Sequence, residues 1–399
     1  MRDRQKSSFV GKAKSMVGAL LGRHSAAEAA RWKDRAKALF PWAVEGLLER
    51  NRQRGVLTFD GNAHGTGFYA GEYEVVMQSL TEMKWVSKVV PDGLNYCFMW
   101  GSKGVAANVR ASALAAKMDA VLVVCEDGFL RSADTWANLS APDRYRHGCS
   151  VVFDTLGHYF DATRPSSVEN MLNNPALCLT DAQRTEARRV MERIVTAKLT
   201  KYNHQPIFVP QVGRPGHRKV LVVDQSYGDM AIAKGWGSDK TFAEMLEDAK
   251  RENPDADILV KTHPDTMTGK RGGYYTDVRE EGNVFRVTMP VNPYSLMEIV
   301  DKVYVCSTQM GFEALMAGKE VHVYGMPFYA GWGLTIDKQK NPRRTNHRTL
   351  EEVFYIFYLM YTHWVDIETG RPCTIDKAMD NLLALREEYG RVGGVPDER

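Results

Sequence analysis

The clearest pattern of hydrophobic and polar positions lies in the second half of the chain, where short apolar runs alternate with amphipathic stretches. Apolar runs of strand length occur at 220–223, 257–261, 284–288, 302–306 and 320–324. The helical spacing of apolar residues recurs between them, at 240–251, 293–300 and 311–318. Strands that alternate with helices are typical of a parallel sheet covered by helices. The pattern therefore predicts a Rossmann-like lobe.

The first half shows the same alternation in a weaker form. Strands are expected at 55–59, 96–99, 120–124 and 150–153, with an alanine-rich helix at 105–118. Helical spacing also predicts a helical N-terminal region and two C-terminal helices, at 349–365 and 375–389. A cluster of prolines and glycines at 206–219 indicates a linker between two lobes.

These elements divide the chain into four parts. We expect an N-terminal helical segment (1–56), a first Rossmann-like lobe that holds the acceptor side (57–210), a second Rossmann-like lobe (211–345) and C-terminal helices that pack back on the lobes (346–399). Within the α/β class, two such lobes with a cleft between them and a helical tail form the GT-B architecture. Other two-lobed α/β proteins share this outline, so the pattern alone indicates no activity.

The composition is typical of a folded protein of about two domains and does not indicate a particular function. The chain has 399 residues, with Lys+Arg 52, Asp+Glu 49, a formal net charge of +3 and 44% hydrophobic positions. These values exclude a disordered chain, a collagen and a coiled coil. The basic excess is small and the basic residues are spread along the chain, so we expect no nucleic-acid partner.

Neither the cysteines nor the N-terminal region indicates a bound cofactor. The six cysteines are scattered without a CxxC pair, so we expect no metal site and interpret them as reduced thiols of a cytoplasmic protein. No run approaches the ~20 apolar residues that span a bilayer. Basic residues surround a short apolar run at 16–21, which we interpret as part of a solvated helix rather than a signal peptide. A peripheral contact with anionic lipid is the alternative.

Basic residues follow one of the expected strands in the second lobe. Lys261 and His263 stand directly after the apolar run, and Pro264 restricts the backbone beside them. Open α/β sheets bind ligands at the carboxyl ends of their strands, so these residues favour an anionic ligand. The alternative is a structural loop with a surface histidine.

Hydroxyl-bearing residues follow another strand of the same lobe. Ser307 and Thr308 come after 302–306 and can donate hydrogen bonds to a phosphate, while Glu313 could accept them from ribose hydroxyls. A serine or threonine that only caps a helix is the alternative. Two segments of the same lobe, each able to bind a phosphate, favour a nucleotide as the ligand.

Carboxylates also stand at expected strand ends. Glu126 and Asp127 are adjacent, which is costly unless they are solvated, paired or used in proton transfer. Arg131 could instead neutralise them in a structural ion pair. The other candidates are aspartates, each of which could also be only a turn residue or a helix cap: Asp154, Asp161, Asp224 and Asp229.

Aromatic residues and glycines fill the segment 325–335, which follows the strand expected at 320–324. Its rings, which include Tyr329 and Trp332, could form the wall of a sugar or base site, and its glycines permit a tight backbone. The dinucleotide fingerprint GxGxxG and the phosphate-binding GxxxxGK[ST] do not occur. The nucleotide site is therefore expected to use other loops.

Together these segments resemble the capsule polysaccharide β-Kdo transferases. Those bacterial enzymes move 3-deoxy-D-manno-octulosonic acid (Kdo) from CMP-β-Kdo to an acceptor and retain the β configuration. The resemblance extends over about residues 95 to 340 and follows the order WGSK, EDGFLRS, DATRPS, DQSYGDMAIAKG, KTHPD, STQMGFEAL and YGMPFYAGWGLT. The last motif is long and specific, whereas the HP dipeptide and EDG would be weak alone.

The resemblance implies a GT-B fold in which the second lobe binds CMP, with no cofactor and no metal. It places His263 at the phosphate and makes Asp229 the candidate nucleophile of a retaining double displacement. Glu126 or Asp127 inherits the acid/base role that the EDG motif has in related, inverting sialyltransferases. Arginine pairs bidentately with carboxylates and would bind that of the sugar.

The expected site residues form three sets. The catalytic candidates are Asp229, Glu126, Asp127, Asp154 and His263. The candidates for CMP and phosphate binding are Lys261, His263, Pro264, Ser307, Thr308, Gln309 and Glu313. The candidates for sugar binding are Arg131, Arg164, Tyr329 and Trp332.

The expected partners are CMP-Kdo and a glycan or glycolipid acceptor, either a capsule linker or the end of an O-antigen. We expect a cytoplasmic protein that could contact the inner membrane or further domains of a larger synthase. Two other functions stay open at this point: an inverting, sialyltransferase-like CMP-sugar transferase, and a non-catalytic module that binds a nucleotide sugar.

Overall fold

The computed structural model describes residues 63–66, 96–101, 112–113, 115–117, 119, 121–135, 138, 140–263, 266, 272–369 and 371–391. The helical segment expected at 1–56, the strand expected at 55–59 and Pro264 lie outside the described residues. The chain divides into two compact units, Met1–Glu126 and Asp127–Arg399. The domain boundaries expected at 57, 211 and 346 stay predictions.

Parallel strands are described in the first unit. β1 (Ala63–Thr66) pairs with β2 (Tyr96–Trp100), and β2 pairs with β3 (Val121–Asp127), which ends at the boundary between the units. Val123 and Cys125 of β3 are fully buried. The strands expected at 96–99 and 120–124 are confirmed.

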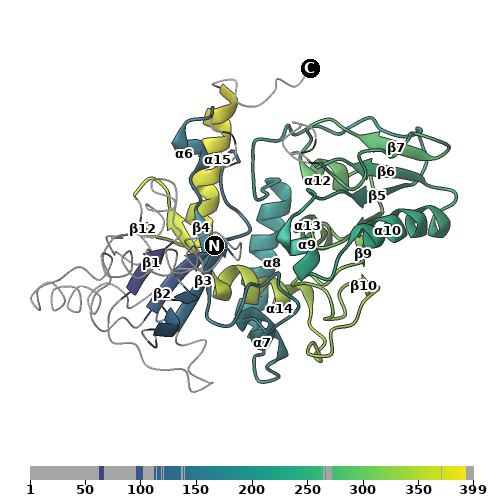
Figure 1. Ribbon diagram of the computed structural model, residues 1–399. Helices are drawn as coiled ribbons and strands as arrows, with labels where there is room; N and C mark the ends of the chain where they lie inside the picture. Colours follow the sequence, from purple (N-terminus) through teal and green to yellow (C-terminus); the bar gives the residue numbers. More distant parts are fainter. Residues whose placement is uncertain are drawn as a thin grey trace, which may run out of the picture. The chain divides into compact units, whose positions relative to one another are not determined.

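The second unit contains the predicted Rossmann-like sheet, whose strands lie in the order β10-β9-β8-β5-β6-β7 and are all parallel (Figure 1). The strands are β5 (Lys219–Val223), β6 (Asp257–Lys261), β7 (Val284–Val287), β8 (Lys302–Val305), β9 (Glu320–Val323) and β10 (Ile336–Asp337). The helices between them are α9 (Met230–Lys234), α10 (Asp239–Glu252), α12 (Pro293–Met297) and α13 (Met310–Met316). The expected alternation of strands and helices is confirmed.

Both faces of this sheet are buried. Val222 of β5 belongs to one hydrophobic cluster with Phe242 of α10, whereas the next residue, Val223, belongs to a second cluster with Phe312 of α13. Successive side chains of a strand point to opposite faces, so helices cover both sides. This explains why the strands are continuous apolar runs in the sequence.

Further elements of the second unit precede and follow the sheet. They are α6 (Asp143–Arg146), β4 (Ser150–Asp154), α7 (Ser167–Asn173), α8 (Asp181–Thr196), α14 (Leu350–Phe354), the π-helix η1 (Tyr355–Tyr361), β11 (Thr362–Asp366), β12 (Arg371–Pro372) and α15 (Ile375–Arg391). The strand expected at 150–153 and the helix expected at 375–389 are confirmed.

The helix expected at 349–365 is wrong in its last part. The helical backbone ends at Tyr361, and the following residues form β11, which pairs antiparallel with β4. Thr362, Trp364 and Val365 are β-branched or aromatic, and all of β11 is buried. Residues of this type favour a packed strand, and the partner strand that decides the outcome lies far away in the sequence.

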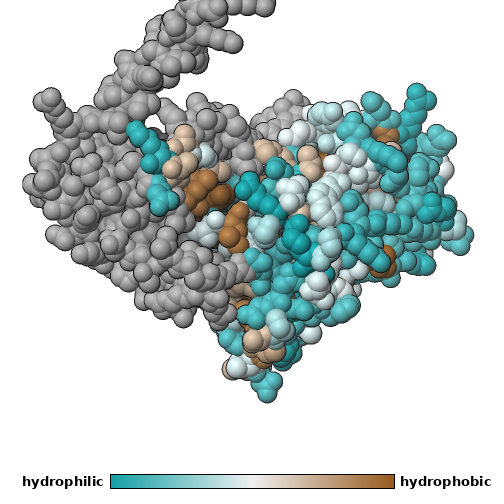
Figure 2. Space-filling model, turned by 60° about the horizontal axis from the view of Figure 1, so that its bottom comes forward, coloured by the Kyte–Doolittle hydropathy of each residue, from teal (hydrophilic) through white to brown (hydrophobic). Residues whose placement is uncertain are grey.

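Among the residues that Figure 2 colours, most are hydrophilic and the hydrophobic ones appear in small groups. No helix among the described residues is both long and apolar enough to cross a bilayer. The large hydrophobic side chains recorded as exposed in the described part are Phe208, Val209, Tyr227 and Ile336.

Candidate functional site

Several predicted motifs meet at one edge of the Rossmann-like sheet. Residues 224–229 follow β5, His263 follows β6, and Ser307 and Thr308 follow β8. β5 and β8 are neighbours, but the chain continues from β5 to β6 on one side and from β8 to β9 on the other. Open α/β sheets bind ligands at such a topological switch point. These residues lie at the carboxyl ends of the strands as expected, and their roles in binding and catalysis stay predictions.

Gln225 joins the two strands at the switch point. Its Oε1 accepts a hydrogen bond from the Ser307 backbone N–H at 2.9 Å, and its Nε2 donates to Ser307 Oγ at 3.2 Å. Gln225 was not among the expected site residues. Its position between two candidate aspartates was the only signal that could have found it, because its partner lies 82 residues away.

Thr308 and Gln309 are held by residues from other motifs. The Thr308 carbonyl accepts a hydrogen bond from the Tyr329 hydroxyl at 2.7 Å, and Gln309 Nε2 donates to the Phe129 carbonyl at 2.8 Å. The Phe129 ring also packs against Phe328, with ring centroids 4.9 Å apart. The EDGFLRS, STQMGFEAL and YGMPFYAGWGLT motifs therefore contact one another directly.

The two basic candidates lie at the end of β6: Lys261 is its last residue, and His263 follows it. His263 is half-buried, and its Nδ1 lies 2.8 Å from Ser226 Oγ. Lys261 is buried, its Nζ donates to the Thr262 carbonyl at 3.1 Å, and burial lowers its pKa to about 8. Burial penalises the charged form of a lysine, so a bound anion would favour its protonation. The pair is therefore suited to a phosphate.

Asp224 fixes the loop beside this pair. Its Oδ1 accepts hydrogen bonds from the backbone N–H groups of Gln225 and Tyr274, both at 2.9 Å. A Cβ atom at Gly273 would lie 2.2 Å from Asp224 Oδ2, so only glycine fits there. Burial raises the pKa of Asp224. These contacts indicate that Asp224 organises the site rather than forming its reactive surface.

Asp229 is the exposed carboxylate at the end of β5. It caps α9, because its Oδ1 accepts a hydrogen bond from the Ala231 backbone N–H at 3.0 Å. The cap that the sequence analysis offered as the alternative is thus present. A side chain can cap a helix and still expose its carboxylate to a ligand, so the catalytic role stays a prediction.

Asp154 is buried in a set of hydrogen bonds. It accepts them from the backbone N–H groups of Leu156 (2.8 Å), Gly157 (3.2 Å) and Ser167 (2.8 Å), and from the Tyr361 hydroxyl (2.9 Å). Burial raises its pKa, which these hydrogen bonds partly oppose. The geometry favours the turn-forming interpretation of this aspartate.

Two cations converge on Asp161. Lys234 Nζ lies 3.1 Å and Arg164 Nε 3.5 Å from Asp161 Oδ2. The carboxylate is buried, and the hydrogen bonds from Thr163 and Lys234 outweigh burial and lower its pKa. One carboxylate thus pairs with two partly exposed cations, so these three side chains together carry a net charge of +1.

Asp127 and Arg131 form a buried ion pair. Arg131 Nε lies 2.9 Å from Asp127 Oδ1, and Lys201 Nζ lies 3.9 Å from Asp127 Oδ2. The Arg131 side chain is fully buried and also donates to Ser132 Oγ at 2.9 Å. The structural ion pair offered as the alternative is present. Glu126 belongs to the first unit and is half-buried.

The aromatic loop after β9 is packed rather than open. Tyr329 and Trp332 are both fully buried, and Trp332 Nε1 donates to the Phe328 carbonyl at 2.8 Å. Each ring has a packing role in this structure, whatever it contributes to a sugar site. The glycines allow this packing, since a Cβ at Gly331, where φ is +82°, would lie 3.1 Å from Arg344 Cδ.

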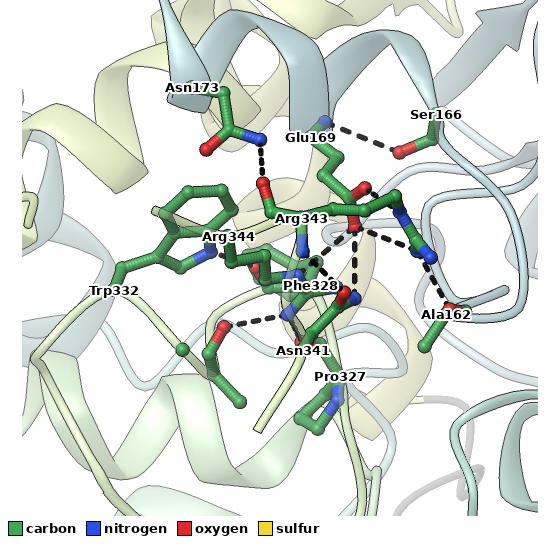
Figure 3. A network of polar contacts seen from close by, with 12 residues as sticks. Ala162, Ser166, Glu169, Asn173, Pro327, Phe328, Trp332, Asn341, Arg343 and Arg344 are labelled. Atoms are coloured by element: carbon green, nitrogen blue, oxygen red, sulfur yellow. Dashed lines mark hydrogen bonds and ion pairs between the residues drawn. The ribbon is translucent and has the colours of Figure 1, made fainter. Parts of the chain in front are cut away.

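A buried network of charges holds this loop (Figure 3). Glu169 on α7 accepts hydrogen bonds from Arg343 Nε at 2.7 Å and from Arg344 Nε at 3.1 Å. Arg344 Nη1 in turn donates to the carbonyls of Pro327 at 2.5 Å and Ala330 at 2.6 Å. The network ties the aromatic loop to α7 and was not found from the sequence.

The buried side chain of Glu313 predicts how the free energy of unfolding depends on pH. It is 4% exposed, and burial raises its pKa to about 8. Between its ordinary value of 4.5 and about 8, the folded protein keeps a proton that the unfolded chain releases. The free energy of unfolding should therefore fall as pH rises through this window, by up to ~1.4 kcal/mol per pH unit.

This prediction is checked by urea unfolding at about pH 5, 6.5 and 8. Glu313→Gln keeps the shape of the side chain but cannot titrate, so its free energy of unfolding should fall less over this range than that of the wild type. Identical pH profiles for the two proteins would contradict the buried, protonated carboxyl.

Lysine side chains contribute positive charge near the switch point. In the part of the chain that the structure describes, no group of three or more His, Cys, Asp and Glu residues could hold a metal ion. The cations near the switch point include Lys261, and Lys234 lies at the end of α9.

The parallel strands of each unit and the His, Lys and Ser residues at the switch point agree with the expected GT-B glycosyltransferase fold, and similar solved structures support it. Thermosulfurimonas dismutans KpsC, beta Kdo 2,4 transferase, is a similar solved structure, with 35% identity, 80% of this chain and 98% of that chain covered, and a TM-score of 0.72. The structure described as Thermosulfurimonas dismutans KpsC, beta Kdo 2,7 transferase, has 25% identity, covers 81% of this chain and 99% of that one, and has a TM-score of 0.57. The expected fold class is confirmed.

The chain belongs to the family described as capsule polysaccharide biosynthesis protein, which matches residues 97–213 and 213–367. Capsule polysaccharide modification protein LipA of Neisseria meningitidis serogroup A is 35% identical over 304 residues, which cover 74% of this chain and 42% of LipA. Lipopolysaccharide-processing protein LpsZ of Rhizobium meliloti is 34% identical over 303 residues, or 75% of this chain and 65% of LpsZ. The chain thus spans less than two thirds of the length of these relatives, and the family resemblance predicted from the motifs is confirmed.

Proposed function

We propose that this chain is a retaining β-Kdo glycosyltransferase that moves Kdo from CMP-β-Kdo to a glycan or glycolipid acceptor. The observation that carries this proposal is the convergence of Asp229, His263 and Ser307 at the switch point of a capsule polysaccharide family member. The similarity to two solved structures described as beta Kdo transferases supports the choice of sugar.

CMP would leave with its phosphate beside His263 and Lys261. His263 is half-buried and hydrogen-bonded through Nδ1 to Ser226, which restricts the orientation of the imidazole. Buried Lys261 has a pKa of about 8, so it carries a proton in much of the neutral pH range and more fully once the phosphate is bound. Preorganised positive charge stabilises a departing phosphate, and this route needs no cofactor.

Asp229 would act as the nucleophile. Its carboxylate attacks the anomeric carbon of Kdo, and the bond from that carbon to the phosphate oxygen breaks as CMP leaves with the electron pair. The acceptor hydroxyl then attacks the same carbon, the aspartyl ester bond breaks, and the hydroxyl proton passes to a base. Two displacements on opposite faces retain the β configuration.

Arg164 is the better candidate for the Kdo carboxylate. Arg131 is fully buried and paired with Asp127, whereas the Arg164 side chain is 58% exposed and shares Asp161 with Lys234. A guanidinium that is accessible can rearrange to pair with a ligand carboxylate.

The acceptor would be a capsule linker or an O-antigen end, and the reaction would take place at the cytoplasmic face of the inner membrane. The proposal is tested by incubating the protein with CMP-Kdo and a panel of Kdo-terminated glycans, with CMP-sialic acid and UDP-sugars as competing donors. Transfer from CMP-Kdo alone is expected. Transfer only from CMP-sialic acid would favour the sialyltransferase-like alternative, and binding of CMP-Kdo without turnover would favour a non-catalytic module.

Replacement of His263 tests the phosphate site. His263→Ala removes a charge-assisted hydrogen bond to the phosphate, so the dissociation constant of CMP should rise about tenfold or more, as measured by calorimetry. The exposed linker residue His217 provides the matched control, since His217→Ala should leave CMP affinity unchanged. Equal CMP affinity and equal turnover in the wild type and His263→Ala would refute the role of His263.

A further inference from the structure

An exposed aromatic ring at the switch point has no part in the chemistry proposed above. Tyr227 is 58% exposed, the most exposed of the large hydrophobic side chains recorded in the described part of the chain. It lies between Ser226, whose Oγ is 2.8 Å from His263, and the Asp229 turn. Exposed aromatic surface costs free energy, so an exposed ring beside a ligand-binding edge points to a ligand.

The backbone holds this ring in a defined position. Asp229 N–H donates to the Ser226 carbonyl at 3.2 Å, and Gly228 has a φ of +77°, as the third residue of a type II turn requires. The Tyr227 N–H itself donates to the Gly272 carbonyl at 2.8 Å. Tyr227 therefore stands at the tip of a turn that is fixed at both ends.

The ring also rests on a stack of aromatic side chains that reaches into the core. Its centroid lies 5.1 Å from that of Tyr274, with an interplanar angle of 40°. Tyr274 stacks on Phe242 with centroids 3.9 Å apart and an angle of 5°. Phe242 on α10 is fully buried. Tyr227, Tyr274 and Phe242 thus form an aromatic platform. Because its rings are already packed, it loses little conformational entropy when a ligand packs on it.

The position along the sheet edge separates this platform from the expected ribose contact. Ser307, Thr308 and Glu313, the last of which is the expected ribose contact, follow β8 on one side of β5. His263, the expected phosphate contact, follows β6 on the other side of β5, and so does Tyr274, which Tyr227 contacts. The platform therefore belongs to the side of the expected phosphate contact and shares a turn with the candidate nucleophile.

We propose that Tyr227 binds carbohydrate, with its ring packed against a pyranose ring of the acceptor glycan. This role rests on the function proposed above for the same site. A pyranose presents apolar C–H groups on its face and hydroxyls at its edge, which match the apolar face and polar tip of an exposed tyrosine. Tyr227 then contributes to the choice of acceptor and not to the binding of CMP.

The test measures acceptor binding separately from turnover. The methyl glycoside of a β-linked Kdo disaccharide is titrated by NMR into wild type, Tyr227→Ala and Tyr227→Phe. We expect the dissociation constant to rise about tenfold in Tyr227→Ala and to stay within about twofold in Tyr227→Phe. The affinity for CMP should be the same in all three proteins. Phe208→Ala, which removes another exposed aromatic ring, is the matched control and should bind like the wild type.

Two results would overturn the role of Tyr227: unchanged disaccharide affinity in Tyr227→Ala, or a loss of CMP affinity in that variant. The melting temperature of Tyr227→Ala is compared with that of the wild type, so that a loss of affinity caused by unfolding is recognised. Turnover of CMP-Kdo by the wild type is measured in parallel. A wild type that does not transfer Kdo contradicts the proposed function, whereas the disaccharide titration still decides the role of the ring.

Discussion

Asp229→Asn is expected to lower the rate of Kdo transfer by ~10³-fold or more, because an amide cannot replace the carboxylate as nucleophile. The substitution is chosen to leave the fold intact. Asn caps helices about as well as Asp, and its side-chain oxygen can still accept the hydrogen bond from the Ala231 N–H. The rate with CMP-Kdo and the melting temperature are measured on the same preparation.

The matched control is Asp239→Asn, which changes another exposed aspartate, in the first turn of α10. It should transfer Kdo at the wild-type rate. Intact mass measurement adds a second readout, since wild type incubated with CMP-Kdo without acceptor should gain the mass of one Kdo residue and Asp229→Asn should not. Full activity in Asp229→Asn would rule out the covalent route through this residue.

Glu169→Gln is expected to lower the free energy of unfolding by about 3 kcal/mol or more, since it leaves two arginines without their carboxylate. The Glu169 and Arg344 side chains are 4% and 3% exposed, so water cannot replace the lost partner at low cost. Arg344 also holds the carbonyls of the aromatic loop and lies 5.5 Å from the Trp332 ring. Urea unfolding followed by tryptophan fluorescence measures the change.

The control for this experiment is a comparable pair at the surface. Glu351 lies 3.3 Å from Arg188, whose side chain is 57% exposed. Glu351→Gln should therefore change the free energy of unfolding by less than about 1 kcal/mol. If both substitutions had equally small effects, the network in Figure 3 would not stabilise the aromatic loop.

The sequence was most informative where local pattern and tertiary structure agree. The strands β5, β6, β8 and β9 are largely buried on both faces, so they appear as apolar runs with clear ends. Because the carboxyl ends of parallel strands share one edge, the positions of His263 and Ser307 followed from those runs. The same logic placed Asp229 at this edge.

Features that depend on distant partners could not be predicted in this way. The strand β11 continues directly from a helix, and only pairing with β4 determines its conformation. The hydrogen bonds of Gln225 to Ser307 and of Glu169 to Arg343 join residues that are 82 and 174 positions apart. The burial of single side chains could not be predicted either. The aromatic and glycine-rich segment around Tyr329 and Trp332 was expected to form a binding loop, yet both rings are packed in the core.

The most direct test of the proposed function is NMR spectroscopy of the product formed from CMP-β-Kdo and a Kdo-terminated glycan by the purified protein. The proposed function predicts one new Kdo residue attached to the acceptor, with the β configuration at its anomeric carbon. An α-linked product would contradict the retaining mechanism, and the absence of any Kdo transfer would contradict the function itself.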